Sequence, residues 1–278
     1  LHDGDWVNVH SSKNEFLGCG HFHNGSIAVK ILSFKPIIDI NDFWVDKFQK
    51  AKNLRNQLDL KETNAYRLIH GEGDFCPGLI IDVYDNVLVF QAHTIGMHRC
   101  QKEIIQALEH VFKNEIIAIY DKSKETLPSE YAANCKNDYI FGNANVPHQV
   151  VENGVKFSVN WVTGQKTGFF IDQRENRYNL GQFAKGKNIL NTFCYSGGFS
   201  MYGLLNGANK VISLDASAKA IDLVNENIQI NGLEKANHQA IVGETLPYLK
   251  NTDEEFDIII LDPPAFAKSV ATKHKALQ

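Results

Sequence analysis

The fold is decided by the stretch Asn188-Ile-Leu-Asn-Thr-Phe-Cys-Tyr-Ser-Gly-Gly-Phe-Ser200 and by Lys210-Val-Ile-Ser-Leu-Asp215, which follows it closely. An apolar strand ends in a turn at residues 195–198, a helix begins at Phe199, and a second apolar strand ends on an acid. This order of elements is typical of the βαβ units that bind nucleotides in doubly wound sheets. It predicts an α/β protein with a Rossmann-like sheet.

The turn itself indicates the kind of ligand. Gly197 and Gly198 allow a sharp turn and let a ligand approach without a Cβ in the way. The carboxylate of Asp215 suits a ribose diol, because an ionised acid accepts two hydrogen bonds at once. A dinucleotide site would show Gly-x-Gly-x-x-Gly, and this turn has too few glycines for a pyrophosphate. S-adenosylmethionine therefore fits better; an ordinary strand–helix turn with a chance acid is the alternative.

A second motif ends the apolar strand of residues 256–261, where the sequence reads Asp262-Pro-Pro-Ala-Phe266. Asp262 precedes a proline and is held extended, while Pro263 and Pro264 lack N–H donors and stiffen the loop. Open α/β sheets bind ligands at the carboxyl ends of their strands. We therefore expect Asp262 and Pro263 to face a target base and Phe266 to stack on it.

Further candidate site residues flank these two motifs. In the linker of residues 164–177, Asp172 can cap a helix that presents Gln173 and Arg174 to the amino acid end of the cofactor; exposed charges on a connecting helix are the alternative. Ser217 can cap a helix reaching to Asn231. Glu244 follows a third strand, residues 240–242, where it could accept the adenine amino group or simply be solvated.

Composition excludes several classes of protein. With 278 residues, 44% hydrophobic and 22% charged, the chain is typical of a globular protein of two or three domains. No apolar run is long enough to span a membrane, and no signal peptide is apparent. The net charge of −4 argues against a uniformly basic coat but leaves room for a local RNA-binding patch. Five scattered cysteines indicate reduced thiols in a cytoplasm, without a zinc site or disulfide framework.

Three parts are expected along the chain. Residues 1–62 contain short β segments and a linking helix over residues 42–60, with Asp42 as its N-cap; its lysines could instead face RNA. Residues 63–162 form an α+β domain with one helix over residues 96–112, and Cys76 lies in a turn that is either structural or reactive. Residues 163–278 form the cofactor-binding part. The start at Leu1 and the presence of only four of about six expected sheet strands suggest a piece of a longer chain.

Three segments carry a family resemblance: Gly168-Phe-Phe-Ile-Asp-Gln-Arg174, Asn191-Thr-Phe-Cys-Tyr-Ser-Gly-Gly-Phe199 and Leu261-Asp-Pro-Pro-Ala-Phe266. With them, nearly the whole chain resembles the bacterial large-subunit ribosomal RNA cytosine-C5 methyltransferase I family. The start of the chain is similar to that family's PUA domain, and residues 63–160 resemble its central domain. Membership implies a class I methyltransferase fold, S-adenosylmethionine as donor and a structured large-subunit rRNA as substrate.

The resemblance also implies roles for single residues. Asp215 would bind the ribose, Ala216 and Glu244 the adenine, with Ser217 beside them, and Asp262 the target base. The methionine part of the cofactor would be surrounded by Asn191, Phe193, Tyr195, Ser196 and Gly197.

One feature departs from the family pattern. Cytosine C5 is a poor nucleophile, so such enzymes first attack C6 with a cysteine thiolate. The family carries that cysteine in a Ser-Cys-Ser segment one strand beyond Asp-Pro-Pro, past residue 278. None of the five cysteines substitutes: Cys194 lies in the cofactor turn where relatives carry serine, and Ala265 stands where another cytosine methyltransferase group has its cysteine. Two alternatives stay open, a guanine-N7 rRNA methyltransferase and a noncatalytic RNA-binding module. A homodimer is a further alternative to a monomer.

Overall fold

The computed structural model describes residues 1–58 and 60–264. The chain divides into two compact units, of which the first comprises residues 1–151 and 159–171. The second comprises residues 152–158 and the chain from residue 172 onward. The three-part division expected from the sequence stays a prediction. No helix in the described ranges combines the length and apolar character needed to cross a membrane.

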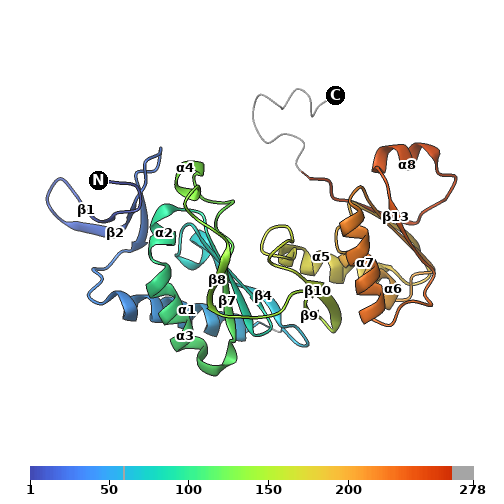
Figure 1. Cartoon of the computed structure of the whole chain (residues 1–278), viewed down its shortest axis with the longest axis horizontal. Helices are drawn as coiled ribbons and strands as arrows, with labels where there is room; N and C mark the ends of the chain where they lie inside the picture. The colour runs from blue at the N-terminus through green and yellow to red at the C-terminus, as the bar shows by residue number, and fades with distance from the viewer. Residues whose placement is uncertain (59, 265–278) are drawn as a thin grey trace. The chain divides into compact units, whose positions relative to one another are not determined.

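The first unit begins with a small antiparallel sheet, shown in blue in Figure 1, whose strands follow the order β1-β2-β3. Its bounds are β1 (Trp6–His10), β2 (Phe16–Phe22) and β3 (Val29–Ser33). Gly20 lets β2 and β3 approach closely, because a Cβ there would lie 2.0 Å from the carbonyl oxygen of Lys30.

The larger sheet of the first unit has five strands in the order β4-β5-β6-β7-β8 and is antiparallel except for the parallel pair β6 and β7. Its strands are β4 (Ala65–His70), β5 (Leu79–Tyr84), β6 (Val87–Ala92), β7 (Ala118–Asp121) and β8 (Asp138–Gly142). Helices α1 (Ile40–Asn56) and α3 (Gln101–Phe112) lie side by side (Figure 1) and bury Trp44, Phe48, Ile104 and Leu108 in the core of this sheet. The two short helices are α2 (Ile95–Arg99) and α4 (Ser129–Ala132).

Two helix boundaries differ from the sequence expectations. The N-cap of α1 is Asp39, not Asp42: Asp39 has an extended backbone, and its carboxylate accepts from the N–H groups of Asn41 and Asp42. The helix expected over residues 96–112 is two helices, since the chain leaves helical geometry at Cys100 (φ −83°, ψ 9°).

The basic residues of α1 are engaged within the chain. The Lys47 ammonium lies 3.1 Å from the carbonyl oxygen of Phe75, and Lys50 pairs with Asp46 on the same helix. Two longer-range ion pairs complete the set, Lys52 with Glu115 and Arg55 with Asp74. These contacts support the interpretation of α1 as a linking helix over that of an RNA-facing one.

The second unit is built on a parallel sheet with the order β13-β12-β11-β14. Its strands are β11 (Asn188–Thr192), β12 (Lys210–Asp215), β13 (His238–Val242) and β14 (Ile258–Leu261). The helices are α5 (Arg174–Phe183), α6 (Gly198–Leu205), α7 (Ala218–Ile230) and α8 (Thr245–Asn251). Parallel strands joined by helices confirm the expected α/β class.

Successive side chains along these strands point to opposite faces of the sheet, so each face has its own packing. Ile189 and Val211 face α6, where Gly203 leaves room for them. The opposite face carries a small core of Leu190, Ile212 and Leu214, against which Tyr248 and Phe256 pack. A hairpin of β9 (His148–Glu152) and β10 (Val155–Val159) precedes the parallel sheet in sequence. Strand β9 was not predicted from the sequence.

Candidate functional site

The strand order of the parallel sheet reverses at β11. From β11 the chain proceeds to β12 and β13 on one side and then returns to β14 on the other side of β11. The register places Thr192 of β11 beside Leu214 on one side and Leu261 on the other. Ligands of open α/β sheets bind where the strand order reverses, outside the carboxyl ends of the strands. The segments after β11 and β14 therefore border the candidate site.

The turn after β11 has an unusual backbone. Phe193, Tyr195 and Gly197 all adopt positive φ, at 51°, 47° and 71°. Non-glycine residues rarely do so, and backbone strain of this kind is concentrated at functional sites. Of the two glycines, only Gly197 is needed for its φ value, because Gly198 begins α6. Gly198 is instead required by packing, since a Cβ there would lie 2.8 Å from Cδ of Arg177.

Asp215 ties this turn to the end of β12. Its Oδ2 accepts from the Tyr195 N–H at 3.0 Å and its Oδ1 accepts from the Ser217 N–H at 2.9 Å. Each carboxylate oxygen has two lone-pair sites, so both oxygens can accept again. Asp215 is therefore held in a fixed orientation and can still bind a diol.

A buried chain of hydrogen bonds links the end of β11, just before the turn, to α6 and to the neighbouring strands. Asn191 Nδ2 donates to Ser200 Oγ at 2.9 Å, and Ser200 Oγ lies 2.6 Å from Ser213 Oγ. Ser213 Oγ lies 2.8 Å from Nε2 of His238. Burial lowers the pKa of His238 to about 4, so this ring is neutral at pH 7 and can accept the last hydrogen bond. Asn191 is thus fixed by the sheet rather than exposed to solvent.

The other side of the candidate site carries Asp262 and Pro263. The exposed Asp262 carboxylate accepts from Nε2 of Gln173 at 3.1 Å, while Oε1 of Gln173 accepts from Asn176. The structure therefore brings together Gln173 and Asp262, which are 89 residues apart in sequence. Phe266, the third residue expected at the target base, lies outside the described residues.

The start of the linker helix differs from its prediction. Asp172 does not cap it, because Asp172 lies within a 3₁₀ turn (Ile171–Gln173) and Gln173 is the N-cap of α5, without a side-chain capping bond. Arg174 and Arg177 are also unlike one another. Arg174 pairs with its neighbour Glu175, whereas Arg177 is buried and binds Glu152.

The remaining expected site residues lie near the ends of β12 and β13. Ser217 is confirmed as the N-cap of α7, and its hydroxyl accepts from the Ala220 N–H. Ala216 is exposed beside it, and Ser196 is buried with its carbonyl oxygen bound by Asn227. Glu244 is exposed at the start of α8 and makes no side-chain capping bond there.

The charges at this edge fit S-adenosylmethionine. Asp215, Glu244 and Asp262 follow three different strands whose carboxyl ends share one edge of the sheet. Carboxylates of this kind complement the sulfonium and ammonium groups of S-adenosylmethionine, and they would repel a pyrophosphate. The arrangement therefore agrees with the sequence-based choice of cofactor.

The buried cysteines are poorly suited to nucleophilic attack. All five are free thiols, and Cys194, although in the cofactor turn, is buried. Burial and the nearby Asp215 carboxylate raise the pKa of Cys194 above its usual value. Burial also raises the pKa of Cys76 and of Cys100 to about 12. These thiols are protonated at neutral pH. No metal-binding group of three or more suitable side chains gathers within residues 1–58 and 60–264.

Sequence reasoning missed the residues that support the site from outside its motifs. Asn227 binds the Ser196 carbonyl oxygen through Nδ2 and the Ser158 N–H through Oδ1, both at 2.8 Å. One signal was available, because Asn227 is a polar residue on the helix face that buries Val224 and Ile228. The pairing of Arg177 with Glu152 offers no comparable signal.

Comparisons with known proteins identify the family of the chain. Residues 66–275 match the family model of S-adenosylmethionine-dependent methyltransferases, and residues 1–34 match a PUA-like domain. The ribosomal RNA large subunit methyltransferase I of Aeromonas hydrophila is 34% identical over 97% of this chain and 69% of its own length. The protein of the same name from Pseudoalteromonas atlantica is 36% identical over 98% of this chain and 70% of its own length.

Solved structures extend the likeness to the fold. A protein from Streptococcus mutans described as a SAM-dependent methyltransferase has a TM-score of 0.83 at 29% identity, covering 99% of this chain and 73% of its own. SMU.776, described as a methyltransferase complexed with SAH, has a TM-score of 0.82 at 28% identity. The match covers 96% of this chain and 70% of the SMU.776 chain. These likenesses do not support the noncatalytic alternative. The chain is an S-adenosylmethionine-dependent methyltransferase and belongs to the ribosomal RNA large subunit methyltransferase I family.

Proposed function

We propose that the chain methylates C5 of a cytosine in large-subunit rRNA. The observation that carries this proposal is the meeting of two motifs at one edge of the parallel sheet: the strained turn anchored by Asp215 follows β11, and Asp262 follows the neighbouring β14. A methyl donor seated on the turn would lie next to a base held by Asp262. The name shared by the relatives supports large-subunit rRNA as the source of that base.

The cofactor supplies a methyl group activated by its sulfonium. Asp215 binds the ribose hydroxyls, and Glu244 accepts the adenine amino group, with Ala216 and Ser217 beside the base. Arg174 and Gln173 face the amino acid end of the cofactor. The methionine part is enclosed by Asn191, Phe193, Tyr195, Ser196 and Gly197.

Asp262 selects the base. Its carboxylate accepts from the exocyclic amine of cytosine, which uracil lacks, and the Gln173 amide keeps the carboxylate oriented. Pro263 and Pro264 stiffen this loop, so the carboxylate is positioned before the base arrives. Phe266 stacking on the base stays a prediction.

The C5 chemistry requires a thiolate. Attack of the thiolate on C6 would make C5 nucleophilic, and C5 would take the methyl group as the S–CH3 bond breaks and S-adenosylhomocysteine leaves. Removal of the C5 proton by a base, such as a water molecule, would then break the bond between C6 and sulfur and release the thiolate. The four buried thiols are unsuited to this role, Cys135 belongs to the first unit, and residues 265–278 contain no cysteine. The proposal therefore requires a cysteine C-terminal to residue 278.

Guanine-N7 methylation is the second candidate. Guanine N7 is already nucleophilic, so proximity to the methyl group is the main requirement. The observation that favours this candidate is the absence of a poised thiol among the cysteines of residues 1–278.

Nucleoside analysis separates the candidates. The complete protein is incubated with unmodified large-subunit rRNA and S-adenosylmethionine, and the digested RNA is analysed by mass spectrometry. We expect 5-methylcytidine, and we expect none with Asp262→Asn. Appearance of 7-methylguanosine instead would identify the second candidate, and an rRNA without any new methyl group would refute both.

A further inference from the structure

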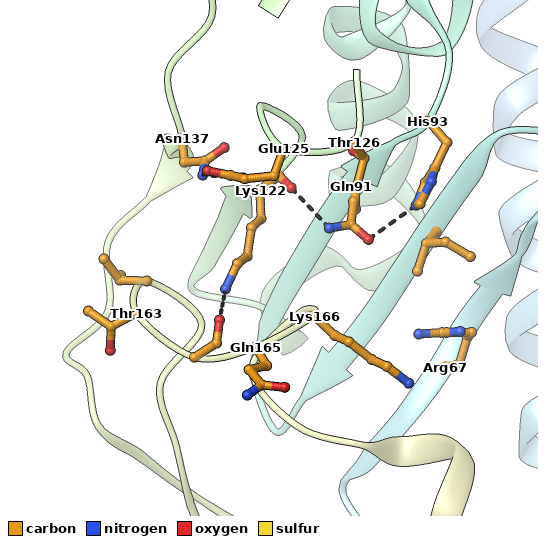
Figure 2. Close-up of a pocket in the computed structure, with 13 residues that line it drawn as sticks. Arg67, Gln91, His93, Lys122, Glu125, Thr126, Asn137, Thr163, Gln165 and Lys166 are labelled. Carbon is orange, nitrogen blue, oxygen red and sulfur yellow. Dashed lines mark hydrogen bonds between the residues drawn. The ribbon is translucent and has the colours of Figure 1, made fainter. Parts of the chain in front are cut away.

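A second candidate site lies in the first unit and is lined by none of the proposed cofactor residues. One face of the five-stranded sheet is covered by α1 and α3. On strands β4, β5 and β6, Arg67, Ile80 and Gln91 line a half-open cavity of about 660 Å³, and the loop of residues 162–166 lines it as well (Figure 2). Sites for small ligands typically enclose about 300–1,000 Å³.

Hydrogen bonds fix the position of the loop of residues 162–166. The buried Lys122 ammonium donates to the carbonyl oxygens of Trp161 at 2.6 Å and of Gly164 at 2.5 Å. Asn160 Oδ1 accepts from two N–H groups at the start of the loop. At its end, Thr167 donates to the buried Asp82 carboxylate at 2.6 Å. The cavity is therefore preformed, which lowers the entropic cost of binding.

The polar groups in the cavity have defined roles. Gln91 Nε2 donates to the Lys122 carbonyl oxygen at 3.1 Å, so the Gln91 oxygen is the partner of His93 Nε2 at 3.1 Å. Since that oxygen can only accept, Nε2 of His93 carries the proton and Nδ1 is an acceptor. Burial lowers the pKa of His93, which favours this neutral form. His93, Gln91 and Thr126 all belong to the cavity lining (Figure 2).

Positive charge converges at the opposite end. Arg67 is fixed by two hydrogen bonds to Asp82, at 2.7 and 2.9 Å, and Figure 2 shows Lys166 pointing toward it. The lining as a whole contains three cations, Arg67, Lys122 and Lys166, against one lining acid, Glu125, and the Asp82 carboxylate that is paired with Arg67. On a chain with a net charge of −4, this local excess favours an anion between the two side chains that point toward one another.

We propose that this cavity binds one unpaired nucleotide of the substrate RNA, with its phosphate between Arg67 and Lys166 and its base edge along Gln91 and His93. The assignment rests on the proposed function only in taking RNA as the substrate. Ile80 and Val162 supply apolar surface for the base or ribose. Proteins recognise unpaired RNA through such combinations of phosphate contacts and base-edge hydrogen bonds.

Binding of a fluorescein-labelled single-stranded RNA from the substrate, followed by anisotropy over a range of salt concentrations, tests the assignment. We expect Lys166→Gln to weaken binding and to reduce the slope of log affinity against log salt by about one. Lys166→Arg keeps the charge and should restore the slope. Gln91→Ala should weaken binding without changing the slope. Lys102→Gln on α3, an exposed position outside the cavity, is the matched control and should behave as wild type.

An unchanged affinity and slope for Lys166→Gln would overturn the assignment, as would an equal effect of Lys102→Gln. Thermal melting of each variant shows whether it is folded. Methyl transfer by the wild-type protein to rRNA is measured in parallel. If the wild type methylates rRNA while Lys166→Gln binds RNA normally, only the cavity assignment fails. If the wild type transfers no methyl group, the proposed function fails.

Discussion

Arg177 and Glu152 form a buried, bidentate ion pair within the second unit. Nε and Nη2 of Arg177 lie 2.8 and 2.6 Å from the two carboxylate oxygens of Glu152, and the residues are 3% and 0% exposed. The Tyr202 hydroxyl also donates to Glu152, at 3.1 Å. Because Glu152 ends β9, Arg177 lies on α5 and Tyr202 lies on α6, this pair joins the hairpin to the helices around the cofactor turn.

Replacing only one partner of the Arg177–Glu152 pair should lower the stability of the fold. Arg177→Met leaves the Glu152 charge buried without its main partner, and we expect the free energy of unfolding to fall by about 3–5 kcal/mol, measured by urea denaturation. The double variant Arg177→Met/Glu152→Leu removes both charges and should recover most of the loss. Lys210→Gln, which breaks the exposed pair with Glu254, is the control and should cost less than ~1 kcal/mol. A loss for Arg177→Met as small as that control would contradict the prediction.

The same arginine explains the second glycine of the turn. A Cβ at position 198 would lie 2.8 Å from Cδ of Arg177, so Gly198→Ala must displace a side chain held by Glu152. Overpacking of this kind costs about 1–3 kcal/mol, and displacement of the turn should also weaken S-adenosylmethionine binding. Calorimetry measures both effects. Gly73→Ala adds a Cβ at ordinary contact distance, 3.7 Å from His70, and should leave stability and binding nearly unchanged. Equal behaviour of the two variants would refute the packing argument.

The sequence predicted what local patterns determine. The strands around residues 188–215 and the Ser217 cap follow from hydrophobic pattern and capping chemistry. The sequence does not distinguish Asp39 from Asp42 as the N-cap of α1, because both are acids before the same apolar pattern and only the backbone angles separate them. The partners Glu152 and Arg177 could not be foreseen, since they are 25 positions apart in sequence and Glu152 ends a strand that was not expected. Long-range pairs depend on topology, which single-sequence patterns do not specify.

Asp215 should dominate cofactor binding. Asp215→Asn keeps the shape of the side chain but removes its charge and one hydrogen-bond acceptor. The Asp215 carboxylate accepts from the Tyr195 N–H and, as we propose, from the ribose hydroxyls. Hydrogen bonds to charged groups contribute about 1.5–3 kcal/mol, so we expect affinity for S-adenosylhomocysteine to fall by about tenfold or more. Isothermal titration calorimetry measures this. Asp222→Asn, an exposed acid on α7, is the matched control. Undiminished binding by Asp215→Asn would remove Asp215 from the cofactor site.

His238 should make folding sensitive to acid. Its pKa is lowered by burial from 6.5 to about 4, so between these values the unfolded chain binds a proton that the folded chain does not. Stability therefore falls as pH is lowered through this window, is independent of this group above it, and stops changing once both states are protonated.

The urea midpoint should thus decline less between pH 7 and pH 5 for His238→Gln than for the wild type. Because His21 has a similarly lowered pKa, some acid sensitivity should remain in the variant. His10→Gln, at an exposed position on β1, controls for the loss of a histidine and should decline as the wild type does. If His238→Gln loses stability as steeply as the wild type, His238 is not the neutral end of the chain of hydrogen bonds that begins at Asn191.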